Sequence, residues 1–208
     1  MKTLSTLSAL ALSAICSASA ATIVFEDQFA NLSNWTTNGQ VAAVSGDYFG
    51  APINTSGTSD HSDIHFDAEG NEITAVGQDF IAFNGAQAPT DPANTISTDI
   101  AVLANNTYTV YFRHAAYTNS AQIITGTFSL GGDSSTTGPI NAVTSYNSES
   151  FSFTPTSSGL ATLQFSDAGS NSFNSDLFLD SVVVAVPEPS SSALLGLAGL
   201  ALVLRRRK

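Results

Sequence analysis

Apolar and polar residues alternate along short segments through most of the chain, a pattern typical of half-buried β-strands. In segment 107–115, Tyr108, Val110 and Phe112 fall on one face, and the residues between them fall on the other. No stretch between residues 21 and 186 has the 3.6-residue apolar period of a helix. Ten strands are expected, at 22–26, 41–44, 64–66, 80–83, 95–100, 107–115, 123–130, 150–154, 161–165 and 177–186.

Turn-forming residues separate these segments. Asn105-Asn106, Gly131-Gly132-Asp133 and Asp167-Ala168-Gly169 each stand between two expected strands. Eight to ten strands in residues 21–186 predict an all-β domain, a two-sheet antiparallel β-sandwich.

The N-terminal residues 1–20 have the pattern of a signal peptide. Lys2 is followed by an apolar stretch and then by Ala18-Ser19-Ala20, so we expect signal peptidase to cut before Ala21. The apolar stretch is shorter than the ~20 residues that a membrane span needs. Cys16, the only cysteine, lies in this segment, so the mature chain is expected to have neither a disulfide nor a thiolate metal site.

The C-terminal residues 187–208 form a third part of the chain. Pro187, Glu188 and Pro189 precede a short apolar segment, 190–204, that is expected to be helical. As a helix these residues would span about 22 Å, which is short for a hydrocarbon core of ~30 Å. A basic cluster then holds this end in the cytoplasm and consists of Arg205, Arg206, Arg207 and Lys208.

This order of motif, apolar helix and basic cluster resembles the PEP-CTERM sorting signal of exported bacterial proteins. The resemblance implies that exosortase, a membrane protease, processes the chain close to Pro187-Glu188-Pro189 after a transient membrane insertion. It also implies a precursor in the inner membrane and a product at the cell surface or in the extracellular matrix. A plain tail anchor with a proline-rich hinge is the alternative.

Two segments of the middle, residues 21–186, are similar to strands of galactose-binding-like jelly rolls. These segments are Asn106-Thr107-Tyr108-Thr109-Val110-Tyr111-Phe112 and the last expected strand, with Leu177-Phe178-Leu179-Asp180-Ser181-Val182. Such jelly rolls often hold a structural calcium ion between their first and last strands. The resemblance therefore implies a calcium site with Glu26, Asp27 and Asp180 as ligands. The alternative is that these acidic side chains are simply solvated and bind no metal.

Charge is distributed unevenly along the chain. Five of the six basic residues lie at the two ends, and between residues 21 and 186 only Arg113 is basic. That stretch holds 16 of the 17 acidic residues, so its formal charge is −15. This acidic balance argues against nucleic acid as a partner, because a phosphate backbone is bound by a surface rich in lysine and arginine.

No catalytic motif occurs in the chain, which contains no Gly-x-Ser-x-Gly, no His-Glu-x-x-His and no P-loop. His61, Asp63, His65 and Asp67 alternate with other residues and would share one face of a strand. Two imidazoles and two carboxylates on one face could bind a divalent metal. The favoured interpretation is instead the solvated face of an edge strand.

Three residues are candidates for binding a sugar. Tyr111 and Arg113 lie on the polar side of one expected strand, and Trp35 could be a stacking platform. An internal ion pair for Arg113 and a core position for Trp35 are the competing interpretations. The PEP-CTERM resemblance also implies an association with exopolysaccharide, so we expect a non-catalytic exported protein in that setting. A carbohydrate-binding module for one glycan and a hydrolase without a recognisable motif are the alternatives.

Overall fold

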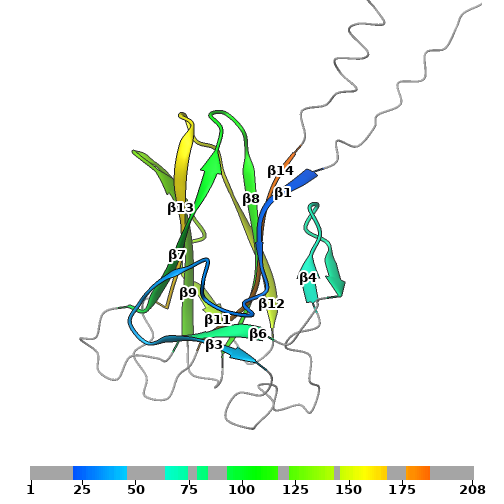
Figure 1. The fold of residues 1–208 in the computed structure, drawn as a ribbon, viewed down its shortest axis with the longest axis vertical. Helices are drawn as coiled ribbons and strands as arrows, with labels where there is room; N and C mark the ends of the chain where they lie inside the picture. Colours follow the sequence, from blue (N-terminus) through cyan, green and yellow to red (C-terminus); the bar gives the residue numbers. More distant parts are fainter. Residues whose placement is uncertain are drawn as a thin grey trace, which may run out of the picture. The chain divides into compact units, whose positions relative to one another are not determined.

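The computed structural model describes residues 21–45, 64–74, 79–83, 93–116, 122–142, 146–167 and 177–187. These residues form two six-stranded sheets and a two-stranded hairpin, and they contain no helix (Figure 1). Every strand pairing is antiparallel, as the sequence predicts. Within these ranges no helix is long and apolar enough to cross a membrane. All of the strands belong to one compact unit, Ala20–Pro187.

Several predicted features lie outside the described residues. They are the signal peptide, the apolar helix, Glu188 and Pro189, the basic cluster, and the candidates His61 and Asp63.

Sheet A is built around the last strand of the unit, β14 (Leu177–Pro187). Its other strands are β12 (Asn147–Phe153), β8 (Tyr108–Ala116), β6 (Asp79–Phe83), β3 (Val41–Ser45) and β1 (Ala21–Asp27). β14 pairs with β8 on one side, and with β6 and then β1 on the other. An irregularity between Leu179 and Val182 interrupts the pairing with β8. At the end of β14, Pro187 is the register partner of Ala21.

Sheet B faces sheet A across the apolar core. Its strands are β10 (Asp133–Thr136), β9 (Gln122–Leu130), β13 (Gly159–Ser166), β7 (Thr95–Val102), β2 (Thr36–Asn38) and β11 (Ile140–Ala142). They lie in the order β10-β9-β13-β7-β2, with β11 paired to the first residues of β9. A two-glycine turn joins β9 to β10, and Gly131 has the positive φ of 60° that glycine adopts without a steric penalty.

A separate hairpin, β4 (Ile64–Phe66) with β5 (Glu72–Thr74), lies beside β14 (Figure 1). Asp67 organises its turn, because Oδ1 accepts the amides of Glu69 at 3.0 Å and Asn71 at 2.8 Å. The Asn71 side chain donates to Oδ2 at 2.8 Å. These bonds, the Asn71 side chain first, hold the pKa of Asp67 below its ordinary value. Gly70 completes the turn with a φ of 82°.

The core between the sheets is rich in aromatic side chains. Tyr108, Val110 and Phe112 all belong to it, so the predicted inward face of this strand is confirmed. The Tyr108 hydroxyl also accepts the amide of Leu103 at 2.7 Å, which fastens the turn that precedes β8. Asn105 occupies the positive-φ position of that turn, at 64°.

The ten predicted strands are all present, with bounds that differ by a few residues. β2, β5, β10 and β11, each of three or four residues, were not predicted. The two-sheet antiparallel sandwich is therefore confirmed.

Candidate functional site

Buried polar side chains gather on sheet A and the β4–β5 hairpin. Among the described residues, five of the seven buried polar or charged residues lie there: His65, Arg113, His114, Asp180 and Ser181. The other two, Asn94 and Asp167, lie at one end of sheet B. Because a buried polar group costs free energy unless it is hydrogen-bonded, each of these positions calls for a partner.

Arg113 and Asp180 form a buried ion pair on the outer face of sheet A. Strand alternation points Arg113 away from the core residue Phe112, and Asp180 lies where the pairing of β14 is irregular. Arg113 Nη1 lies 3.3 Å from Asp180 Oδ2, and the two residues are 6% and 3% exposed. The guanidinium also lies 5.2 Å from the centre of the Tyr146 ring. Burial first, and then the Asp180 carboxylate, raise the pKa of Tyr146 well above its ordinary value.

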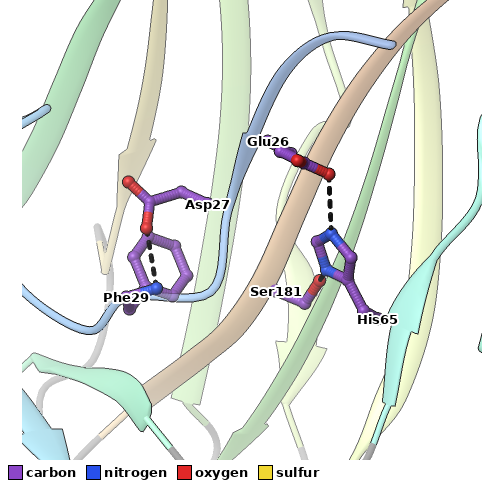
Figure 2. Close-up of polar contacts among 5 residues, drawn as sticks. All are labelled: Glu26, Asp27, Phe29, His65 and Ser181. Carbon is purple, nitrogen blue, oxygen red and sulfur yellow. Dashed lines mark hydrogen bonds and ion pairs between the residues drawn. The ribbon is translucent and has the colours of Figure 1, made fainter. Parts of the chain in front are cut away.

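His65 joins the hairpin to two strands of sheet A (Figure 2). Its Nε2 lies 3.3 Å from Glu26 Oε2, and its Nδ1 lies 2.5 Å from Ser181 Oγ. A carboxylate only accepts, so Nε2 donates to Glu26, and Nδ1 shares its hydrogen bond with the Ser181 hydroxyl. One imidazole thereby connects β4 to both β1 and β14.

Ser181, His65 and Glu26 are linked in the order of a nucleophilic triad. Here, however, the hydroxyl residue is buried and the carboxylate is exposed. Ser181 is 1% exposed, whereas the Glu26 side chain is 58% exposed. A nucleophile must meet its substrate, and the buried Ser181 hydroxyl does not. The three residues therefore fasten the hairpin to the sheet.

Asp27 makes a different set of contacts from its neighbour Glu26, because successive residues of a strand point to opposite faces (Figure 2). Its Oδ1 accepts the amide of Phe29 at 2.7 Å, and its Oδ2 accepts Trp35 Nε1 at 2.9 Å. Phe29 has a φ of 59° here. Asp27 thus fixes the loop that carries Phe29 and Trp35 into the core.

The proposed calcium ligands are directed to three different partners. Glu26 contacts His65, Asp27 contacts the Phe29–Trp35 loop, and Asp180 contacts Arg113. In the part of the chain that the structure describes, no group of three His, Cys, Asp or Glu side chains is arranged to hold a metal ion. Calcium binding stays a prediction.

Two interpretations from the sequence require correction. Trp35 is 8% exposed and packs against Phe25, Phe29 and Phe165, so it is a core residue and not a stacking platform. His65 is 4% exposed, so the solvated face expected for its strand is wrong at this position. Arg113 and Tyr111 do share the polar face of β8, but Arg113 is buried in its ion pair and Tyr111 is half-buried.

His114 lies on the inward face of β8, with its ring centre 5.9 Å from that of Phe112. It is 1% exposed, and neither ring nitrogen has a hydrogen-bond partner among the described residues. Burial disfavours the charged imidazolium and lowers the pKa of His114 to about 4. His114 is therefore neutral in the folded protein near pH 7.

Asn94 and Asp167 clip together the strand ends β7 and β13. The Asn94 amide donates to Asp167 Oδ1 at 2.6 Å, and its side-chain Nδ2 donates to Oδ2 at 2.7 Å. Burial raises the pKa of Asp167, and the bonds from Asn94 oppose that rise. Asn94 Oδ1 also accepts the amide of Gln40, between β2 and β3, at 2.6 Å, so the pair holds the chain together at this end of the sandwich.

An open hollow of about 260 Å³ lies between the hairpin and sheet A. Tyr111 of β8 lies beside Phe66 of β4, with ring centres 5.9 Å apart. Ser150 is the register partner of Tyr111 on the neighbouring strand β12. The Ser148 hydroxyl donates to Glu72 Oε1 at 2.5 Å and so connects β12 to the hairpin. The residues that line the hollow are Phe66, Gly70, Tyr111, Ser148, Glu149 and Ser150.

The hollow combines an aromatic wall, formed by Phe66 and Tyr111, with the hydroxyl groups of Ser148 and Ser150. Of its lining residues, the sequence singled out Tyr111 alone. Ser148 and Ser150 alternate with Glu149 and Phe151, so the sequence indicates that the two serines share one face of their strand. Alternation by itself does not indicate that this face binds a ligand. Their place beside the hairpin depends on contacts between residues far apart in the chain. Aromatic surface with a few hydroxyl groups is the chemistry that binds sugar rings.

Two solved structures share the fold of this sandwich. The structure is similar to the CBM22-1 xylan-binding domain of Paenibacillus barcinonensis Xyn10C, with 13% identity and a TM-score of 0.52, over 83% of this chain and 99% of that chain. It is also similar to the N-terminal CBM22-1-CBM22-2 tandem domain of Xyn10C, with 12% identity and a TM-score of 0.53, over 83% and 47% of the two chains. These likenesses show the fold alone. The sandwich is of the type found in carbohydrate-binding modules.

The second comparison concerns the end of the chain. Residues 185–208 match the PEP-CTERM protein-sorting motif, which includes Pro187, Glu188, Pro189 and the basic cluster. The resemblance stated from the sequence is confirmed at these residues. The comparison with curated proteins found no match.

Proposed function

We propose that this chain is a non-catalytic exported protein whose sandwich binds exopolysaccharide at the cell surface or in the extracellular matrix. The observation that carries the proposal is the hollow, which offers Tyr111, Ser148 and Ser150 on the outer face of sheet A, next to the hairpin residue Phe66. The carbohydrate-binding-module fold and the sorting motif support the same function from two other directions.

Binding is tested by affinity electrophoresis through gels that contain single polysaccharides, including the exopolysaccharide of the native host. The wild-type domain, residues 21–187, is expected to be retarded by at least one of them. Tyr111→Ala should lose that retardation, because the aromatic wall of the hollow is removed. Thr127→Ala, on the outer face of sheet B, is the matched control and should migrate as the wild type does.

Two results bear on the proposal from this experiment. Retardation that Tyr111→Ala abolishes, with circular dichroism unchanged, supports it. Because Tyr111 also packs on Phe66, Ser150→Ala provides a second variant that leaves this ring contact in place. Free migration of the wild type through every gel, the host polysaccharide included, would overturn the proposal.

For sorting, we propose that signal peptidase removes residues 1–20 and that an exosortase-type protease acts near Pro187-Glu188-Pro189. β14 ends at Pro187, and a proline has no amide hydrogen with which to extend a strand. The motif therefore begins where the sheet ends, in reach of a protease. The basic cluster would hold the precursor in the inner membrane until then.

Replacing Pro187, Glu188 and Pro189 by alanine tests the sorting proposal in the native host. The precursor should build up in the membrane, while the thermal midpoint of the domain stays unchanged. Intact mass of surface-fraction protein should show the loss of residues 1–20 and of the tail. Recovery of Arg205–Lys208 in that fraction, or normal release of the alanine variant, would contradict it.

A further inference from the structure

We propose that Glu69 binds the α-ammonium group that signal-peptide removal creates at Ala21, and that this ion pair fastens the turn of the β4–β5 hairpin to β1. The ligand of this site is a primary ammonium group, supplied by the mature chain itself. The inference rests on the proposed cut before Ala21 and goes beyond it, because it assigns a structural consequence to that cut.

The observation behind this inference is a contact between the first residue of β1 and the hairpin turn (Figure 1). The backbone nitrogen of Ala21 donates to Glu69 Oε1 at 3.2 Å, although the two residues are 48 positions apart in the chain. Pairing of Ala21 with Pro187, and of Thr22 with Val186, holds this end of β1 in sheet A. The nitrogen therefore keeps its place beside Glu69 when the peptide bond before it is cut.

The cut changes the chemistry of this nitrogen. In the precursor it belongs to the peptide bond between Ala20 and Ala21, so it is uncharged and has one hydrogen to donate. Hydrolysis adds one water across that bond, which leaves a carboxylate on Ala20 and an amine on Ala21. The amine takes up a proton near pH 7, because α-amino groups have a pKa of about 8. The resulting ammonium carries three donors and a full positive charge next to the Glu69 carboxylate.

Such a charge would be rare in this domain. Residues 21–187 contain 16 acidic side chains and no lysine, and their one arginine, Arg113, is buried against Asp180. The α-amino group of Ala21 would thus be the only primary amine in the domain. The structure places this single amine within hydrogen-bond distance of a carboxylate, so its charge is used inside the fold.

The turn that contains Glu69 has few other connections. Residues 67–71 are hydrogen-bonded mainly among themselves, and among the described residues the Ala21 contact is the only hydrogen bond from this turn to another element. The next residue, Gly70, lines the hollow and lies so close to the Tyr111 ring that a Cβ would overlap it. Strengthening the contact at Glu69 therefore also steadies one wall of the hollow.

The experiment compares a free and an acetylated amine at Ala21 in the domain of residues 21–187. Because this domain has no lysine, Ala21 is the only target of a reagent that acetylates primary amines. Acetylation restores an uncharged amide with one hydrogen, as in the precursor. Hydrogen exchange then reports opening of the turn at the amides of Asp67 and Gly70, which are bonded within it. Acetylation should speed this exchange about two- to fivefold, the effect of losing one exposed ion pair.

Two variants show whether the ammonium acts through Glu69. Glu69→Gln keeps an acceptor but loses the charge, so acetylation should no longer change the exchange rates in this variant. Asp99→Asn is the matched control, because it removes the same charge from sheet B and keeps an acceptor for Thr162. Acetylation should speed exchange in Asp99→Asn as much as it does in the wild type.

Three outcomes would overturn the inference. The first is equal exchange in the free and acetylated wild-type domains. The second is an effect of acetylation that persists in Glu69→Gln, because the ammonium would then act through another carboxylate, such as the C-terminal one at Pro187. The third is an effect that Asp99→Asn removes as completely as Glu69→Gln does, which would assign the attraction to the acidity of the whole domain.

The proposed cut is judged separately, by the intact mass of protein from the native host. If that protein begins at Ala21 and exchange does not depend on the amine, the inference fails and the proposed cut stands. If the protein begins at another residue, the proposed cut and the inference both fail.

Discussion

The two sheets of the sandwich use the same alternation but differ in what covers their outer faces. Sheet B presents to solvent the short polar side chains Thr95, Ser97, Asp99, Thr125, Thr127, Ser129, Thr162, Gln164 and Ser166. Sheet A carries the β4–β5 hairpin on its outer face and buries Arg113, Asp180, His65 and Ser181 beneath or beside it. The outward polar groups of sheet B lie at the surface, where Thr162 also donates to Asp99, whereas the buried polar groups of sheet A need partners within the protein. Most of the buried polar side chains of the described residues therefore lie on sheet A and its hairpin.

The largest expected effect comes from breaking the buried ion pair of sheet A. Arg113→Met removes the guanidinium and leaves the 3%-exposed Asp180 without it. Loss of one partner of a buried pair costs about 3–5 kcal/mol of unfolding free energy, measured here by urea denaturation. Gln164→Met, on the outer face of sheet B, should change it by less than about 0.5 kcal/mol. A loss for Arg113→Met as small as that of the control would mean that the pair is not a buried one.

The next largest effect is a pH dependence that arises in sheet A. The pKa of His114 is about 4 in the folded protein and near 6.5 when unfolded, so between these values the unfolded chain binds more protons. The free energy of unfolding therefore falls as pH decreases from about 6.5 to about 4. At about 1.4 kcal/mol per pKa unit, the loss amounts to about 3 kcal/mol.

Denaturation at pH 7 and pH 5 with and without His114 isolates this contribution. His114→Leu should lose less stability than the wild type between these two values. Asp167 in sheet B contributes with the opposite sign, because its raised pKa favours folding as pH falls, and it is present in both proteins. Identical pH profiles for the two proteins would show that His114 is not the group that titrates.

Two glycines with positive φ allow a finer comparison. Gly70 has a φ of 82°, and a Cβ there would overlap the Tyr111 ring, whereas Gly131 has a φ of 60° and open space around it. Gly131→Ala should cost about 1–2 kcal/mol from backbone strain alone. Gly70→Ala should cost more, since the hairpin must also move away from Tyr111, and it should weaken polysaccharide binding. Equal losses of stability and unchanged binding would mean that the hollow does not depend on the hairpin.

The smallest effect is expected on the outer face of sheet B. Thr127→Val exchanges a hydroxyl for a methyl group at an outward position, and its effect on the thermal midpoint should correspond to less than about 0.5 kcal/mol. Polysaccharide binding should be unchanged in affinity electrophoresis. A loss of binding would place the ligand on sheet B, contrary to the proposed site.

The sequence predicted the strands better than the site, and the two sheets show why. The alternation in 107–115 placed Tyr108 and Phe112 in the core and Arg113 opposite them, since a strand has a strict period of two. Nothing in the sequence indicated that a short hairpin would bring His65 to Ser181, 116 residues away. That contact depends on how the hairpin is placed against β14, which alternation within a strand does not determine.

The pairing of Ala21 with Pro187 places the first and last residues of the folded domain side by side. A short peptide could therefore join these ends without stretching the sheet, and the chain could be opened instead at the exposed Gly131-Gly132 turn. Such a circular permutant would keep every strand but carry no native terminus at the Pro187 edge. A leader or tail attached to the permutant would leave from the turn between β9 and β10 in sheet B, instead of from β1 and β14 in sheet A. Export and sorting could then be tested separately from folding.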